Sequence, residues 1–138
     1  MFVVDTDIMT LLQHGHERVT DRFRQASQVV VTTVISRIEM LEGRFAAVMK
    51  AADGIQLLFA QQRLEQSENH LRGVPILAVD SASAAEFDRL RQNKKLKKIG
   101  RPDLLIASIT LANRATLVSR NLKDFRQVPG LQMENWAD

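Results

Sequence analysis

Short runs of apolar, mostly β-branched residues alternate along the chain with longer stretches in which apolar residues recur every three or four positions. The runs predict strands over residues 2–4, 28–31, 75–79 and 116–118, with a short fifth strand over 131–133. Strands that alternate with helices are typical of βαβ units, which place their strands parallel in one sheet. The pattern therefore predicts an α/β fold, a three-layer α/β/α sandwich around a central, mostly parallel sheet of four to five strands.

The periodic stretches predict the helices. Four helices are predicted over residues 6–12, 17–24, 55–71 and 103–112, and Asp5 caps the first of them. Two further helices are predicted between these ranges. One is capped by Thr32, Thr33 or Ser36, and the other begins at Asp80. The 103–112 stretch is apolar on nearly all sides, which predicts a central, buried helix. Trp136 is expected to fold back onto the body of the protein.

Composition narrows the possible chemistry. The chain has 138 residues, 45% of them hydrophobic and 25% charged, which indicates one domain over residues 1–138. It contains no Cys, so disulfides, thiolate metal sites and a cysteine nucleophile are excluded, and any metal must be held by oxygen or imidazole. The net charge of +3 is compatible with nucleic-acid binding. No signal peptide or membrane-spanning run is evident, which predicts a cytoplasmic protein.

Acidic residues lie shortly after the carboxyl ends of several predicted strands. Asp5 comes directly after the first strand, Glu39 lies in the helix after the second, and Asp103 begins the buried helix. Asn121 and Asp124 lie in the predicted loop after the fourth strand. The carboxyl ends of parallel strands share one edge of the sheet, where ligands bind. Carboxylates gathered there repel one another unless a hard divalent cation neutralises them, and such an ion activates water for attack on a phosphodiester.

Each acid also has a purely structural interpretation. Asp5 can be an N-cap, and the spelling Ser36-x-x-Glu39 is that of a capping box. Asp103 follows a proline at a helix start, where a negative charge suits the helix dipole, and Asp124 can be a solvated loop residue. Only their joint placement favours a functional site.

Five segments then match a known family in order and spacing. They are Val-Val-Asp-Thr-Asp-Ile at 3–8, Ile-Glu-Met-Leu-Glu-Gly at 38–43, Ile-Gly-Arg-Pro-Asp-Leu-Leu-Ile-Ala at 99–107, Leu-Val-Ser-Arg-Asn-Leu-Lys-Asp-Phe at 117–125, and the tail with Val-Pro-Gly-Leu at 128–131 and Glu-Asn-Trp at 134–136. Together they resemble the PIN-domain ribonucleases, and more closely the VapC-type toxins of bacterial type II toxin–antitoxin pairs. The resemblance runs nearly from end to end.

The resemblance implies roles for particular residues. It implies that Asp5, Glu39, Asp103 and Asp124 are catalytic acids that bind metal, with three supporting residues beside them: Asn121, Thr6 and Asp7. It also implies an endoribonuclease that depends on Mg²⁺, with Mn²⁺ as a possible substitute. Asp7 stands where the family often has Asn, and Ser119 replaces the usual Thr.

The resemblance also implies partners. These are an RNA substrate, a cognate VapB-like antitoxin that inhibits the enzyme, a homodimer, and a hetero-oligomer with the antitoxin, with no role for a membrane. Ile38, Leu41, Phe45 and Val48 form an apolar stripe that is most typical of core. With Leu57, Leu58 and Leu64, the stripe can instead form the groove that receives an antitoxin helix.

Basic residues cluster just ahead of Asp103, at Lys94, Lys95, Lys97, Lys98 and Arg101. A run of this kind is often only a solvated helix end. Its position beside the acids favours contacts with RNA phosphates, above all by Lys97, Lys98 and Arg101, and Arg120 is a further RNA-binding candidate.

Parts of this pattern are also compatible with two other functions. A PIN-fold module that binds RNA or antitoxin without catalysis would share the fold. A haloacid-dehalogenase-type phosphatase would share the strand followed by Asp5-x-Asp7, but such enzymes usually place Thr where this chain has Met9.

Overall fold

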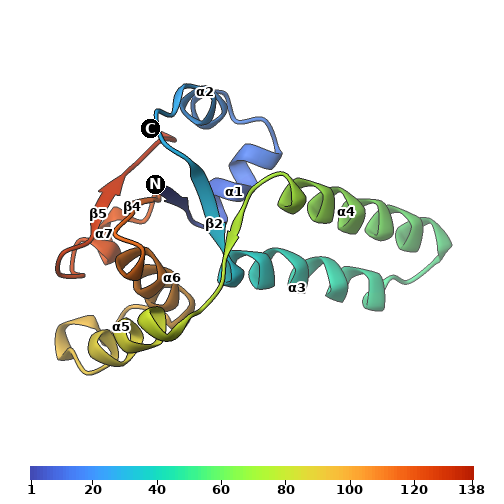
Figure 1. The fold of residues 1–138 in the computed structure, drawn as a ribbon. Coiled ribbons are helices and arrows are strands. Elements are labelled where there is room, and N and C mark those ends of the chain that lie inside the picture. Colours follow the sequence, from blue (N-terminus) through green and yellow to red (C-terminus); the bar gives the residue numbers. More distant parts are fainter.

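Five parallel strands form one sheet at the centre of the protein (Figure 1). The computed structural model describes all residues, 1–138. The strands are β1 (Phe2–Val4), β2 (Val30–Thr33), β3 (Ile76–Leu77), β4 (Thr116–Val118) and β5 (Gln132–Glu134), in the spatial order β3-β2-β1-β4-β5. Every neighbouring pair is parallel, which confirms the predicted α/β class and sheet. β1 is central, so its carboxyl end lies between those of β2 and β4.

Seven helices and one 3₁₀ turn connect the strands. They are α1 (Thr6–Gln13), α2 (Glu17–Gln25), α3 (Val34–Lys50), α4 (Gly54–Arg72), α5 (Ser81–Arg91), η1 (Lys94–Leu96), α6 (Arg101–Ala112) and α7 (Leu122–Phe125). Aspartate side chains cap three of them, because Asp5, Asp53 and Asp80 each accept a hydrogen bond from the backbone N–H three residues on. No helix has the length and apolar character that a membrane crossing requires.

Alternation along the strands produces the three layers. Val3, Val31 and Leu117 belong to a core cluster with residues of α5 and α6. The next residue of β1, Val4, belongs to a second cluster that contains Ile8 and Met9 of α1 together with Trp136. Successive strand side chains point to opposite faces, so one sheet packs against helices on both sides. Trp136 is 2% exposed, which confirms that the tail folds back.

The second strand begins and ends two residues later than the sequence pattern predicts. Thr32 and Thr33 are both fully buried in β2, and Thr33 is also the N-cap of α3, which confirms it among the predicted cap residues. Thr32 Oγ1 donates to the carbonyl of Val4 (2.8 Å), and Thr33 Oγ1 accepts from Ser36 N (3.2 Å). Each hydroxyl thus has a partner, which lets a polar residue occupy a buried strand. β3 is also shorter than predicted.

Helices α3 and α4 lie side by side and extend away from the sheet as a hairpin (Figure 1). The apolar stripe on α3 was predicted to be core, and for its exposed members this is wrong: Ile38 is 52% and Phe45 is 50% exposed. No other layer covers the hairpin where it projects beyond the sheet. Exposed apolar side chains continue along it at Met49, Ile55, Leu57, Leu58 and Phe59. The alternative interpretation, a groove for a partner, fits this exposure.

Candidate functional site

Asp5 occupies the turn between β1 and α1. Its Oδ1 accepts a hydrogen bond from Ile8 N at 3.0 Å, so the capping role is confirmed. The side chain is also buried, and burial raises the carboxyl pKa from 3.8 to about 6. This value is the net of opposing effects, because the negative charges of Asp7 and Asp103 also raise the pKa while hydrogen bonds from Ser119 and Ile8 N lower it. The cap therefore holds in place a carboxylate whose charge the protein only partly stabilises.

Glu39 is not part of a capping box. The N-cap of α3 is Thr33, and Ser36 lies within the helix, so the predicted Ser36-x-x-Glu39 box is wrong. Instead, Glu39 Oε1 lies 2.6 Å from Thr6 Oγ1, which lies 2.9 Å from Ser36 Oγ. A hydroxyl has one proton, so Thr6 donates to the carboxylate and accepts from Ser36. This chain of three side chains draws Glu39 toward the start of α1.

Asn121 joins the other two acids. Its Nδ2 lies 3.2 Å from Asp103 Oδ2 and 3.1 Å from Asp124 Oδ2, so the two amide protons bridge two carboxylates. Asp103 lies in the first turn of α6, and Asp124 lies in the short helix α7 rather than in the predicted loop. Burial raises the pKa of Asp103, the charges of Glu39 and Asp124 raise it further, and the Asn121 hydrogen bond opposes them.

The predicted acids are therefore gathered at the carboxyl edge of the sheet. The charge of Asp103 acts on Asp5, and those of Glu39 and Asp124 act on Asp103, so the four belong to one electrostatic cluster. No three acidic or imidazole side chains of the protein are arranged so that they could hold one metal ion. Hard oxygen donors and mutual repulsion nevertheless fit a divalent cation, which would offset that repulsion.

The two predicted RNA-binding regions differ in the structure. Arg120 is paired, because its Nε lies 3.1 Å from Asp7 Oδ2. The five cations of the run at residues 94–101 are exposed, and none lies within ion-pair distance of a carboxylate. Arg101 instead places its guanidinium 5.1 Å from the ring centroid of Phe87. The run presents positive charge to solvent beside the first turn of α6, where Asp103 lies.

Sequence reasoning missed two serines that support the acids. Ser119 is fully buried at the end of β4, where its Oγ accepts from Asn121 N (2.9 Å) and its hydrogen bond lowers the pKa of Asp5. Ser36 is also fully buried and positions Thr6. The available signal was position: a small polar residue directly after a buried strand, or one helical turn before an acid.

Both the sequence and the fold are similar to those of known proteins. The PIN domain family model matches residues 2–131. Ribonuclease VapC2 of Haemophilus influenzae is 25% identical over 139 residues, covering 99% of this chain and 98% of its own. The tRNA(fMet)-specific endonuclease VapC of Salmonella typhimurium is 21% identical, with the same coverage. The crystal structure of VapBC2 from Rickettsia felis, bound to a DNA fragment from its promoter, superposes with a TM-score of 0.81 at 24% identity over 98% of both chains.

Proposed function

This chain belongs to the PIN domain family, and we propose that it is an endoribonuclease that acts as the toxin of a toxin–antitoxin pair. The observation that carries the proposal is the cluster of Asp5, Glu39, Asp103 and Asp124 at one edge of the sheet, in which the pKa values of Asp5 and Asp103 are raised. Perturbed carboxylates gathered at the carboxyl edge of a parallel sheet favour a catalytic over a structural role.

The same four acids are the residues that would hold a divalent cation, for which we propose Mg²⁺, with Mn²⁺ as a substitute. No three of them lie so that they could hold one ion, so in this arrangement one or two carboxylates would bind the cation and water would complete its coordination. When bound, the cation would supply the positive charge that activates water and stabilises the phosphate as charge builds up on it. The cap bond from Ile8 N fixes one oxygen of Asp5.

The surrounding residues orient the acids and the substrate. Asn121 holds Asp103 and Asp124 together through its two amide protons, and Thr6 directs Glu39 toward α1. Both are positioning residues in this proposal. The exposed cations of residues 94–101 would contact RNA phosphates and hold the strand in register beside the acids.

The antitoxin would bind the exposed apolar face of the α3–α4 hairpin. A groove of about 360 Å³ lies along α3, lined in part by Ile38, Leu41 and Phe45, and one of about 390 Å³ lies between the two helices near Ile55 and Phe59. An amphipathic helix that places apolar anchors in such grooves is a common way to bind a partner. A homodimer, a cytoplasmic location and a single domain over residues 1–138 are further parts of the proposal.

Cleavage of RNA by the purified protein tests this function. We expect cleavage that requires added Mg²⁺ or Mn²⁺, stops in EDTA, and falls at least about a hundredfold in Asp103→Asn, because several kcal/mol of charge stabilisation are lost. Asp21→Asn, an exposed acid on α2, is the matched control and should cleave normally. Full activity in EDTA or in Asp103→Asn would reject the metal-dependent mechanism. RNA binding without any cleavage would indicate the silent-module alternative, and phosphatase activity alone would indicate the dehalogenase-type enzyme.

A further inference from the structure

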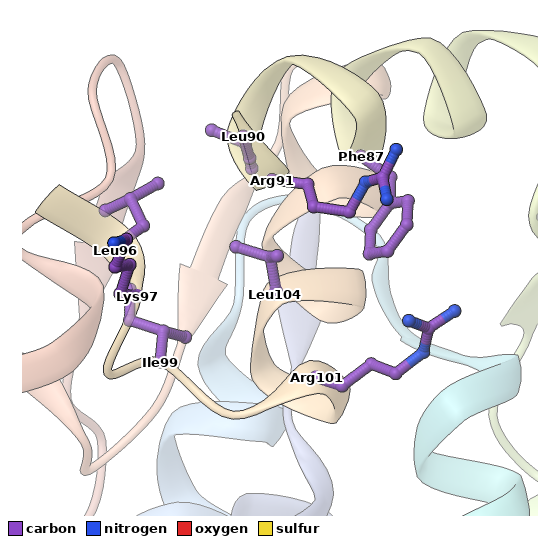
Figure 2. A pocket seen from close by; sticks show the side chains of 8 residues that line it. All are labelled: Phe87, Leu90, Arg91, Leu96, Lys97, Ile99, Arg101 and Leu104. Atoms are coloured by element: carbon purple, nitrogen blue, oxygen red, sulfur yellow. The ribbon is translucent and has the colours of Figure 1, made fainter. Parts of the chain in front are cut away.

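A hollow of about 230 Å³ opens between the end of α5, η1 and the start of α6 (Figure 2). Its floor consists of Leu90, Leu96, Ile99 and Leu104, all buried members of one core cluster. Since these side chains are fixed by packing on their other sides, the floor is a stable apolar surface. Its remaining lining is Phe87, Arg91, Lys97 and Arg101. We call it the α5–α6 hollow.

The rim of the α5–α6 hollow is positive, and its charges are available. No carboxylate lines it. Lys97 and Arg101 have no acidic partner, and Arg91 has only a 3.9 Å contact with Asp88 of its own helix. Figure 2 shows Phe87, Arg91 and Arg101 around the hollow, and the Arg101 guanidinium lies 5.1 Å from the centroid of the Phe87 ring. A guanidinium held by an aromatic ring keeps its N–H groups free for an anion.

The α5–α6 hollow is next to the acid cluster but faces another direction. Arg101 and Asp103 are two residues apart in α6, about 3 Å along the helix axis. Asp103 contacts Asn121 on the side of β4, whereas Arg101 and Leu104 face α5. The two sites therefore share the first turn of α6, and an RNA strand that reaches Asp103 would bend around this turn to place a neighbouring nucleotide in the hollow.

We propose that the α5–α6 hollow binds one nucleotide of the RNA substrate, next to the phosphate that is cut. The base would lie against Phe87 and the leucine floor, and its phosphate would contact Arg101 and Lys97. An apolar floor with a cationic rim suits a nucleotide, which has a flat base and an anionic phosphate. Bases in single-stranded RNA also stack on aromatic rings and guanidinium groups. The proposal rests on the ribonuclease function and assigns the hollow a role in choosing the cleavage site.

Binding of single-stranded RNA oligonucleotides in EDTA tests this site without cleavage. The oligonucleotide spans the cleavage site, and each nucleotide near that site is replaced in turn by an abasic one. We expect wild-type affinity to fall about five- to tenfold when one particular base is missing. In Phe87→Leu, that position should no longer matter. In Arg101→Ala, which removes the guanidinium 5.1 Å from the Phe87 ring, total affinity should fall and the effect of the missing base should be smaller. Arg18→Ala, an exposed cation on α2, is the control and should keep the wild-type profile.

Three results would overturn the assignment. If the wild type binds every abasic oligonucleotide equally well, no base is held in a pocket. Both variants retaining the wild-type profile would place the sensitive base elsewhere. Variants that bind all RNAs normally but escape inhibition by the antitoxin would assign the hollow to the protein partner. Arg101 is exposed, so its variant stays informative even if Phe87→Leu fails to fold. Absence of all RNA cleavage by the wild type would instead reject the ribonuclease function itself.

Discussion

The guanidinium of Arg120 and the carboxylate of Asp7 form an ion pair across the ends of β4 and β1, with Nε and Oδ2 3.1 Å apart. Each side chain is about half exposed, at 48% and 52%, so the pair is accessible to a competing anion. Arg120 follows Ser119, and Asp7 follows Thr6, both of which touch the acid cluster. On the proposed function, an RNA phosphate that approaches the acids would compete with Asp7 for this arginine.

The first prediction concerns that competition. Asp7→Asn removes a negative charge and releases Arg120, so we expect RNA affinity in EDTA at low salt to rise about two- to fivefold, as fits the modest energy of an exposed pair. In the Arg120→Ala background the same substitution should give a smaller gain, due to the lost charge alone. An equal gain in both backgrounds would show that the pair does not restrain Arg120.

Asp5 links activity to stability through its pKa. The pKa of this carboxyl is 3.8 in the unfolded chain and about 6 in the folded protein. Between these pH values the unfolded state is already ionised while the folded state keeps its proton, so rising pH favours unfolding. A pKa difference of about 2 corresponds to roughly 3 kcal/mol lost above pH 6.

Asp5→Asn should therefore be more stable than the wild type above pH 6, by about 2–3 kcal/mol, and on the proposed mechanism we expect it to lose RNA cleavage. Asn is a good N-cap, so the bond to Ile8 N is kept. Urea denaturation at pH 4 and at pH 7.5 measures the effect, and the advantage of the variant should shrink at pH 4. A constant difference at both pH values would rule out ionisation of Asp5 as its cause.

The α3–α4 hairpin should bind the antitoxin without taking part in catalysis. Leu58 is 66% exposed, so Leu58→Asp should fold normally. We expect antitoxin affinity to fall at least about tenfold, because a charge is placed in an apolar interface, while free toxin cleaves RNA as before. Val79→Asp changes an exposed valine outside the hairpin and serves as control. Titration calorimetry with purified antitoxin measures both, and equal affinities would place the antitoxin elsewhere.

Trp136 should be a major contributor to stability. It packs edge-on against Phe2 with ring centroids 5.2 Å apart, and its Nε1 donates to Glu134 Oε2 at 2.8 Å. Trp136→Ala should cost about 3–5 kcal/mol, or roughly 10 °C or more in Tm. Trp136→Phe keeps an aromatic ring and should cost distinctly less. Thermal denaturation followed by circular dichroism compares them, and a Tm unchanged in Trp136→Ala would contradict the packing.

Much of this architecture was predictable from residue pattern. Val3 and Val4 are both apolar because they face opposite helical layers, and a continuous apolar run is the pattern of a buried parallel strand. The acids were predictable too, since strand ends in a parallel sheet meet at one edge. What could not be predicted was how they are held there, because the bonds among Thr6, Ser36 and Glu39 join residues some thirty positions apart.

The exposure of Phe45 was also not predictable from the sequence. Helical spacing shows that α3 has an apolar face, but spacing is identical whether this chain or another molecule covers that face. Asp7 and Arg120 illustrate the same point for charge, since each looks unpaired in the sequence. Only the alignment of β1 beside β4 brings them together.

The central place of β1 has a consequence for when the protein becomes active. β1 comprises residues 2–4, yet its pairing with β4 waits for residues 116–118, and Asp124 comes later still. Contacts so distant in the chain form late in folding. During synthesis, the first strand stays with an unpaired edge until most of the chain has been made. A chain that ends before residue 116 would therefore lack the pairing of β1 with β4 as well as Asp124, and it could not assemble the acid cluster.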